Sequence, residues 1–246
     1  MDRIKGCAAA ATGFCLFLAL VLFIIAVDVR NMAGDRLLFS GEMLHYVPPH
    51  ESGIPEEDYT ELGRMTADYL TGKRDVFQFT YKDANGNVVE CFHDYEAEHM
   101  ADCRRLILLA ADLRWILGGI SLVLIIMCIA LRKDREKIIS GILAGFALTA
   151  AAYLAMLVWG LVDFDGLFTT FHRIAFTNDL WILNPGTDLL IRLMPTEFFV
   201  KLGIRLMLGI AAIALALFSV SKTIQMAIRK GRQEEEQLAA AAARNA

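Results

Sequence analysis

Residues 6–27 read GCAAAATGFCLFLALVLFIIAV, 22 consecutive positions without a charged side chain. A helix needs about 20 mostly apolar residues to cross the hydrocarbon core of a bilayer. Three further apolar runs follow, over 115–131, 138–162 and 198–221, and 56% of the chain is hydrophobic. This pattern predicts a mainly α-helical, polytopic membrane protein with four transmembrane helices.

The basic residues predict the orientation of these helices. The first run is longer than the apolar core of a signal peptide, about 7 to 15 residues, and no small-residue cleavage site follows it, so we expect an uncleaved helix. Lys and Arg collect on the cytoplasmic side of membrane proteins, and here they gather before residue 6, in RKDREK over 132–137, and after residue 221. Both termini and the middle loop are therefore predicted to be cytoplasmic.

The large segment between the first two runs is acidic, with 17 acidic and eight basic residues over 28–112. Such a charge balance argues against nucleic acid as a partner. Residues 52–72 carry the pattern of an amphipathic helix, with Pro55 near its start and Gly72 as its stop. VFQFTY (76–81) and NVVECFH (87–93) flank Asn85-Gly86, which indicates a β-hairpin. We expect a small extracytoplasmic α+β cap, in which Cys91 and Cys103 either pair or remain free thiols.

The predicted organisation follows from these segments. We expect transmembrane helix 1 over 1–28, the extracytoplasmic cap over 29–94, a helix that continues into transmembrane helix 2 over 95–132, a cytoplasmic loop over 133–137, transmembrane helix 3 over 138–162, an extracytoplasmic helical loop over 163–197, transmembrane helix 4 over 198–221, and a cytoplasmic tail over 222–246.

Histidines supply the candidate chemistry, and the predicted topology puts all five of them on the outer side. His99 lies in the polar stretch YEAEHMADCRR (95–105), where helical spacing places Glu96 and Asp102 on its face. A carboxylate beside an imidazole fixes its tautomer and raises its basicity, as a general base requires. His172 precedes a loop with further polar and aromatic candidates, Asn178, Asp179 and Trp181.

Two other classes of function fit the same residues. Glu96, His99, Asp102 and Cys103, completed by His172, are acceptable ligand types for zinc, which allows a metal-dependent membrane hydrolase. The H-x-x-x-H and C-x-x-C spacings of metal sites are missing from the sequence, as are the serine-hydrolase, Walker and dinucleotide motifs. A non-enzymatic membrane scaffold with an acidic outer domain is the third possibility.

The height of His99 above the membrane sets a condition on any role at the lipid surface. It precedes Trp115 by 16 positions, about 24 Å along a straight helix. We therefore expect this helix to tilt or to enter the interface early, so that His99 reaches the headgroup region and comes within about 10 Å of His172.

Two stretches make the chain resemble the Lit family of bacterial lipoprotein intramolecular transacylases. The first is EAEHMADC (96–103), with its E-x-x-H-M-x-D core, and the second is FHRIAFTNDLWILNPGTDLLIRLMP (171–195). The four-span layout with a large outer segment after the first span agrees, so the resemblance covers nearly the whole chain. Cys103 stands where the family leads us to expect an aliphatic residue.

The resemblance implies an acyl transfer within one substrate, at the outer face of the bacterial cytoplasmic membrane. A diacylglyceryl-cysteine lipoprotein, held in membrane lipid, passes its sn-2 acyl chain to its own α-amino group and becomes a lyso-form lipoprotein. The family's two histidines map onto His99 and His172, which are taken as catalytic, with no metal and no cofactor. We assign the base to His172 as a working choice and leave the reverse assignment open.

Overall fold

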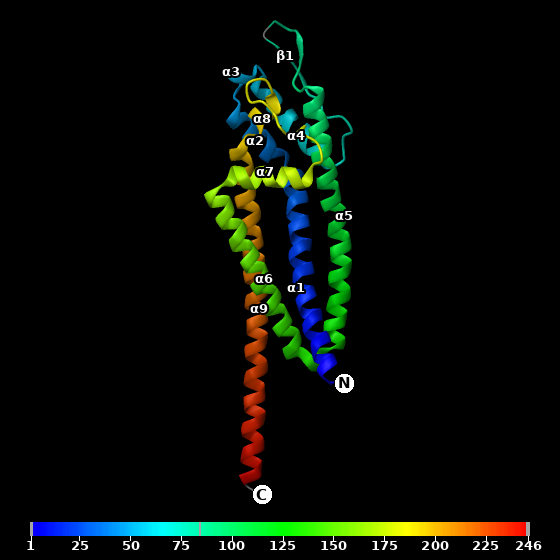
Figure 1. The fold of residues 1–246 in the computed structure, drawn as a ribbon, viewed down its shortest axis with the longest axis vertical. Helices are drawn as coiled ribbons and strands as arrows, with labels where there is room; N and C mark the ends of the chain where they lie inside the picture. Colours follow the sequence, from blue (N-terminus) through cyan, green and yellow to red (C-terminus); the bar gives the residue numbers. More distant parts are fainter. Residues whose placement is uncertain (1, 84, 245–246) are drawn as a thin grey trace. The chain divides into compact units, whose positions relative to one another are not determined.

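The computed structural model describes residues 2–83 and 85–244 and is almost entirely helical (Figure 1). Its elements are α1 (Asp2–Ala33), α2 (Arg36–Tyr46), α3 (Pro49–Ser52), the 3-10 helix η1 (Glu56–Asp58), α4 (Tyr59–Leu70), β1 (Thr80–Lys82), β2 (Val88–Glu90), α5 (Asp94–Ala130), the 3-10 helix η2 (Arg132–Asp134), α6 (Arg135–Val162), α7 (Phe164–Ala175), α8 (Leu189–Leu193) and α9 (Thr196–Arg244). Within these described residues, four helices, α1, α5, α6 and α9, are long and apolar enough to cross a membrane. The predicted fold class is confirmed.

Contacts between residues divide the chain into two compact units. Unit 1 comprises Met1–Phe23, Ile116–Leu154 and Gly209–Ala246. Unit 2 comprises Ile24–Trp115 and Ala155–Leu208. Both candidate histidines and the whole cap belong to unit 2, so the site is built within one unit.

Small residues set the packing of unit 1. A side chain at Gly141 would meet the backbone carbonyl of Ala10, and one at Gly13 would meet that of Ile138. Helix–helix contacts in membranes favour glycine where two backbones approach closely, because no hydrophobic force draws apolar helices together in lipid. α1 and α6 therefore pack backbone to backbone here.

A single apolar core holds the cap of unit 2 together. Most of its fully buried members come from α2, α4, α8 and the start of α9, and include Met43, Leu62, Leu193 and Phe198. Buried polar groups in this core are satisfied: the Tyr59 hydroxyl donates to the Val47 carbonyl and lies 2.7 Å from Ser52 Oγ. The cap can therefore act as a rigid support for the helix ends beneath it.

The cap differs from expectation in its helices. The predicted helix over 52–72 is divided into η1 and α4, because Pro55 adopts an extended conformation ahead of η1 and α4 begins only at Tyr59. Helix α2 was not predicted. Its N-cap is Asp35, whose carboxylate accepts from Leu38 N at 3.1 Å.

The hairpin is present as a two-stranded antiparallel sheet in which Thr80 pairs with Glu90 and Lys82 with Val88. Gly86 has φ of +82°, the left-handed conformation that makes glycine the favoured residue in such a turn. Cys91 and Cys103 are both free thiols. At the other end of the chain, the expected fourth span and tail form one continuous helix, α9.

Candidate active site

Helix α5 begins at the cap and carries the first histidine. Glu96 accepts a hydrogen bond from the backbone nitrogen of His93 at 2.8 Å, the reciprocal contact of a capping box, and so marks the start of the helix. Its 37 residues extend about 56 Å, well beyond the roughly 30 Å hydrocarbon core. The charged residues of α5 all precede Trp115, so the expected span begins there, 16 positions after His99.

Helix α7 carries the second histidine and bridges α9 and α5 within unit 2. It is capped by Asp163, whose carboxylate accepts from Gly166 N at 2.8 Å. Phe168 packs on Phe199 of α9, with ring centroids 5.0 Å apart. Figure 1 shows α7 running crosswise to the first turns of α9. This crosswise course carries His172, near the end of α7, to the side of α5.

The two histidines, 73 positions apart in sequence, form a buried pair. Their ring centroids are 6.1 Å apart, with an interplanar angle of 33°. His99 is 8% exposed and His172 6%. Phe176 contacts both rings, at centroid distances of 5.2 Å and 5.4 Å. The predicted proximity, within about 10 Å, is met.

Backbone geometry selects the tautomer of His172. Its Nδ1 lies 2.8 Å from the Phe168 carbonyl oxygen, and a carbonyl can only accept a hydrogen bond. The proton therefore resides on Nδ1, and Nε2 of the neutral ring has a free lone pair. Burial lowers the pKa of His172 below its ordinary value, although the bond to Phe168 opposes this shift. The ring is consequently neutral at pH 7.

His99 is held differently. The Cys103 thiol lies 3.6 Å from its Nε2, and burial raises the pKa of that thiol to about 12, so it keeps its proton. Nδ1 of His99 is buried and has no hydrogen-bond partner among residues 2–83 and 85–244. Burial, with a further contribution from His172, lowers the pKa of His99 to about 4, and Asp102 opposes the shift only in part.

The expected carboxylate neighbours of His99 engage other partners. Glu96 is fully buried and, besides capping α5, accepts from Leu190 N of α8 at 2.8 Å. Asp102 pairs with Arg105 and accepts from the Asn178 side chain at 2.7 Å. Neither carboxylate bonds the His99 imidazole. The pKa of His99 is lowered, whereas helical spacing led us to expect a raised value.

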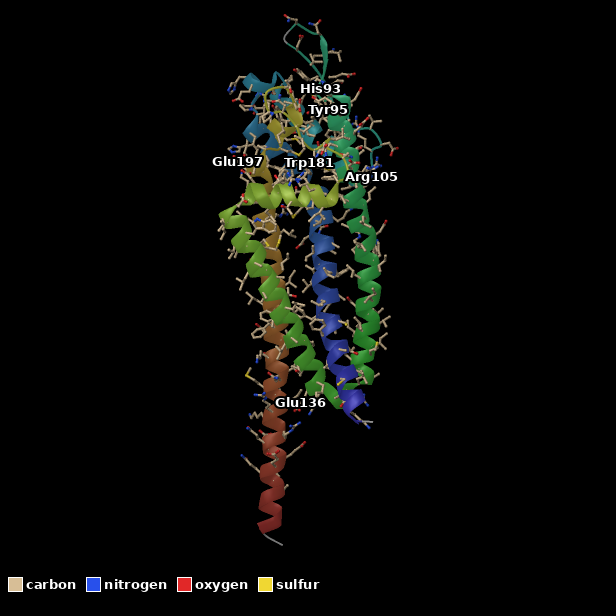
Figure 2. All side chains as sticks on the ribbon, in the orientation of Figure 1. His93, Tyr95, Arg105, Glu136, Trp181 and Glu197 are labelled. Atoms are coloured by element: carbon tan, nitrogen blue, oxygen red, sulfur yellow. The ribbon has the colours of Figure 1, made fainter. Side chains whose placement is uncertain are left out.

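Of the three candidate residues in the loop after α7, Asn178 and Trp181 contact residues of the site, whereas Asp179 is exposed. Asn178 joins this loop to α5 through Asp102, and its side-chain oxygen accepts from Leu180 N at 3.1 Å. Trp181, labelled in Figure 2, lies against His172 with centroids 5.1 Å apart. Asp179 is exposed and lines an adjacent pocket of about 410 Å³ together with Asn178 and Trp181.

Two contributors were missed by sequence reasoning, the Phe168 carbonyl and the Phe176 ring. The Cys103 thiol, named from sequence as a possible metal ligand, contacts His99 instead. Helical spacing alone flags Phe168 and Cys103, each four positions from a histidine, but not the direction of the contact. A further link joins Tyr95 to Asp188, whose carboxylate accepts from the Tyr95 hydroxyl at 2.6 Å. In the described part of the chain, no three His, Cys, Asp or Glu side chains gather as a metal site.

The low pKa of His99 makes stability depend on pH. The folded state has a pKa of about 4 and the unfolded state an ordinary value near 6.5. The unfolded state therefore binds the proton first as pH falls, and stability that is complete above pH 6.5 declines toward pH 4, by roughly 3 kcal/mol in total. Thermal unfolding in detergent should show this decline, with a shallower slope for His99→Gln. Equal slopes would contradict the shifted pKa.

Fold and site together define a polytopic helical membrane protein with two buried histidines that lie side by side. The family described as lipoprotein intramolecular transacylase Lit matches residues 14–199. The chain belongs to this family, as its two sequence stretches predicted. No curated protein matches the chain.

Solved structures agree on the fold. The membrane integral lipoprotein intramolecular transacylase Lit from Bacillus cereus superposes with a TM-score of 0.70 at 18% identity, over 95% of this chain and 100% of that one. Two variants of the same protein, with one histidine replaced by arginine or by alanine, give TM-scores of 0.66 and 0.67 at 18% identity. These cover 94% of this chain, and 97% and 98% of theirs.

Proposed function

We propose that the chain transfers the sn-2 acyl chain of a diacylglyceryl-cysteine lipoprotein to that lipoprotein's own α-amino group. The observation that carries this proposal is the buried histidine pair, with ring centroids 6.1 Å apart, in a member of the transacylase family. The products are an amide and a free sn-2 hydroxyl on one molecule, a lyso-form lipoprotein. Holding ester and amine in a single substrate supplies the proximity that such a transfer needs.

His172 acts as the base in this proposal. An α-amine has a pKa of about 7.7 to 8.0 and is mostly protonated at neutral pH. Nε2 of His172, left with a lone pair by the Phe168 contact, removes one proton from the ammonium group. The amine lone pair then forms a bond to the ester carbonyl carbon, whose oxygen becomes an oxyanion. The proton held by His172 leaves to solvent after the reaction.

His99 acts as the hydrogen-bond donor and acid. If the Cys103 thiol donates to Nε2, the ring proton lies on Nδ1, which is buried and has no partner in the described chain. This N–H stabilises the oxyanion and, as the ester C–O bond breaks, protonates the departing sn-2 oxygen. The attacking nitrogen loses its second proton, which restores the neutral imidazole of His99. Donors arranged in advance for the developing charge are strong contributors to catalysis in a dry site.

The exposed face of α7 supports a position for the site at the outer surface of the bacterial cytoplasmic membrane. Phe171 and Ile174, 53% and 81% exposed, lie on one face of a helix that follows directly after the lipid-exposed end of α6. Amphipathic helices of this kind lie in the membrane interface. With α7 in the interface, His172 meets the lipid ester without any tilt of α5. Both termini are then cytoplasmic, as the basic residues indicate.

The proposal is tested by expressing the chain in a bacterium that makes diacyl lipoproteins and analysing lipoprotein N-termini by mass spectrometry. The expected product carries an N-acyl group and one O-linked chain, at the total mass of the diacyl form. Unchanged diacylglyceryl lipoprotein with a free amine would contradict the proposal. Released fatty acid without N-acylation, abolished by a chelator, would instead indicate a metal-dependent hydrolase.

A further inference from the structure

Two arginines in unit 2, on α1 and α5, have no carboxylate partner among the described residues. Arg30 is in the last turn of α1, and Arg114 stands on α5 directly before Trp115. Within residues 2–83 and 85–244, neither guanidinium has an Asp or Glu oxygen at ion-pair distance. Arg30 donates to the Thr71 carbonyl, and a side chain at the next residue, Gly72, would lie 3.2 Å from Leu108 of α5. The end of α1 therefore adjoins the part of α5 that leads to Arg114, and the two positive charges repel each other. The positive charge at this point is therefore doubled and not neutralised by the protein.

Both arginines lie on the inward faces of their helices. Arg30 falls between Ala26 and Ala33, which are buried and share its face at helical spacing. Arg114 follows the buried Ala111 by three positions, and its Nε is itself buried and unpartnered in the described chain. These side chains therefore do not extend freely into solvent as isolated surface arginines do.

The nearest carboxylates in sequence do not neutralise the pair. Asp28 and Asp112 are each two positions from an arginine, and residues two apart on a helix project from opposite sides. The contact that Arg30 makes is with the Thr71 carbonyl, at 3.2 Å. A carbonyl satisfies one N–H but carries no charge. A partly buried cation without a counter-charge is costly, so an anion from outside the chain would stabilise this pair.

We propose that Arg30 and Arg114 bind the phosphodiester group of a resident phospholipid. Guanidinium groups recognise phosphate oxygens through paired hydrogen bonds. The Arg114 guanidinium lies 5.0 Å from the Trp115 ring centroid, and Trp115 is 73% exposed, as expected of a tryptophan at headgroup level. This lipid is distinct from the transacylation substrate, whose diacylglyceryl thioether contains no phosphate, and the inference does not depend on the proposed function.

Native mass spectrometry of the full chain in mild detergent tests this inference. Three probes are added: phosphatidylglycerol, the phosphate-free lipid dioleoylglycerol, and inorganic phosphate. We expect one tightly retained phosphatidylglycerol, with affinity lowered roughly 10- to 100-fold by Arg30→Gln or by Arg114→Gln, because each removes a charged hydrogen-bond donor. Lys82→Gln, which removes an exposed positive charge from β1, serves as the matched control and leaves retention unchanged.

Three outcomes overturn the inference. They are equal retention of phosphatidylglycerol by the glutamine variants, equal retention of dioleoylglycerol by the unaltered chain, and displacement of the lipid by inorganic phosphate, which would indicate a free-anion site. If a glutamine variant does not fold, Arg30→Lys and Arg114→Lys replace it. Lysine keeps the positive charge but lacks the planar guanidinium with its paired N–H donors. These variants should therefore weaken phosphatidylglycerol retention less than tenfold. Lysine variants that bind more tightly than the unaltered chain also contradict a guanidinium–phosphate contact.

Discussion

Replacement of His172 by alanine is expected to lower the rate of N-acylation by about 10²- to 10⁴-fold, the usual contribution of a positioned general base. The reason is geometric. The Phe168 carbonyl holds the proton on Nδ1 at 2.8 Å, so Nε2 of the neutral ring is the free lone pair of this side chain. The measurement is the initial rate of conversion of a diacylglyceryl lipopeptide, followed by mass spectrometry with purified protein in detergent.

A second substitution separates loss of the base from loss of the fold. In His172→Asn, the side-chain amide nitrogen takes the place of Nδ1 and can still donate to the Phe168 carbonyl, but nothing replaces Nε2. We expect this variant to unfold at the same temperature as the unaltered chain and to be as slow as His172→Ala. His50→Ala is the matched control, because the His50 side chain is 78% exposed. A wild-type rate for a stable His172→Asn would exclude this residue as the base.

The membrane-spanning part of the fold was predictable because its physical cause is local. An apolar run of about 20 residues forms a helix in lipid whatever the rest of the chain does, since each backbone group must be satisfied within the segment. The hairpin was predictable for a similar reason, as Asn85-Gly86 favours the turn. Helix α2 was missed because its apolar face is covered by α4 and α8, contacts that no local pattern reveals.

Sequence reasoning named the candidate residues and expected His99 and His172 to lie close together, but it did not predict the contacts of the neighbouring carboxylates. Helical spacing correctly grouped Glu96, His99 and Asp102 on neighbouring positions of α5, but it could not say which partners they would meet. Glu96 bonds Leu190 N, 94 positions away, and Asp102 bonds Asn178, 76 positions away. Such contacts depend on the tertiary fold. They convert both expected neighbours of His99 into links that join α5 to α8 and to the loop after α7.

Burial explains why the pKa of His99 is lowered, although its acidic neighbours in sequence predicted a raised value. From sequence, a histidine between two acidic residues should have a raised pKa. In the structure the ring is 8% exposed and adjoins a second histidine, and these effects outweigh Asp102, so the pKa falls to about 4. A neutral His99 suits a donor of hydrogen bonds better than a base, which agrees with the division of labour proposed for the pair.

Because His99 is proposed as the hydrogen-bond donor, we expect a second large effect on the N-acylation rate at this position. His99→Ala should lower the N-acylation rate about 10²- to 10³-fold, the cost of one oxyanion donor. His99→Asn should recover part of this loss, because its amide N–H takes the place of Nδ1–H, whose buried atom has no partner in the described chain. The same lipopeptide assay applies, with unfolding temperatures recorded for each variant.

The asparagine variants at the two positions should therefore behave oppositely. Asparagine keeps the donor that His99 supplies, but it lacks the lone pair that His172 supplies, so His99→Asn should be faster than His99→Ala while His172→Asn equals His172→Ala. The reverse pattern would make His99 the base and His172 the donor. Recovery at neither position would mean that His99 contributes mainly by transferring a proton and not by its hydrogen bond to the oxyanion, because an amide can donate a hydrogen bond but cannot carry a proton through the reaction.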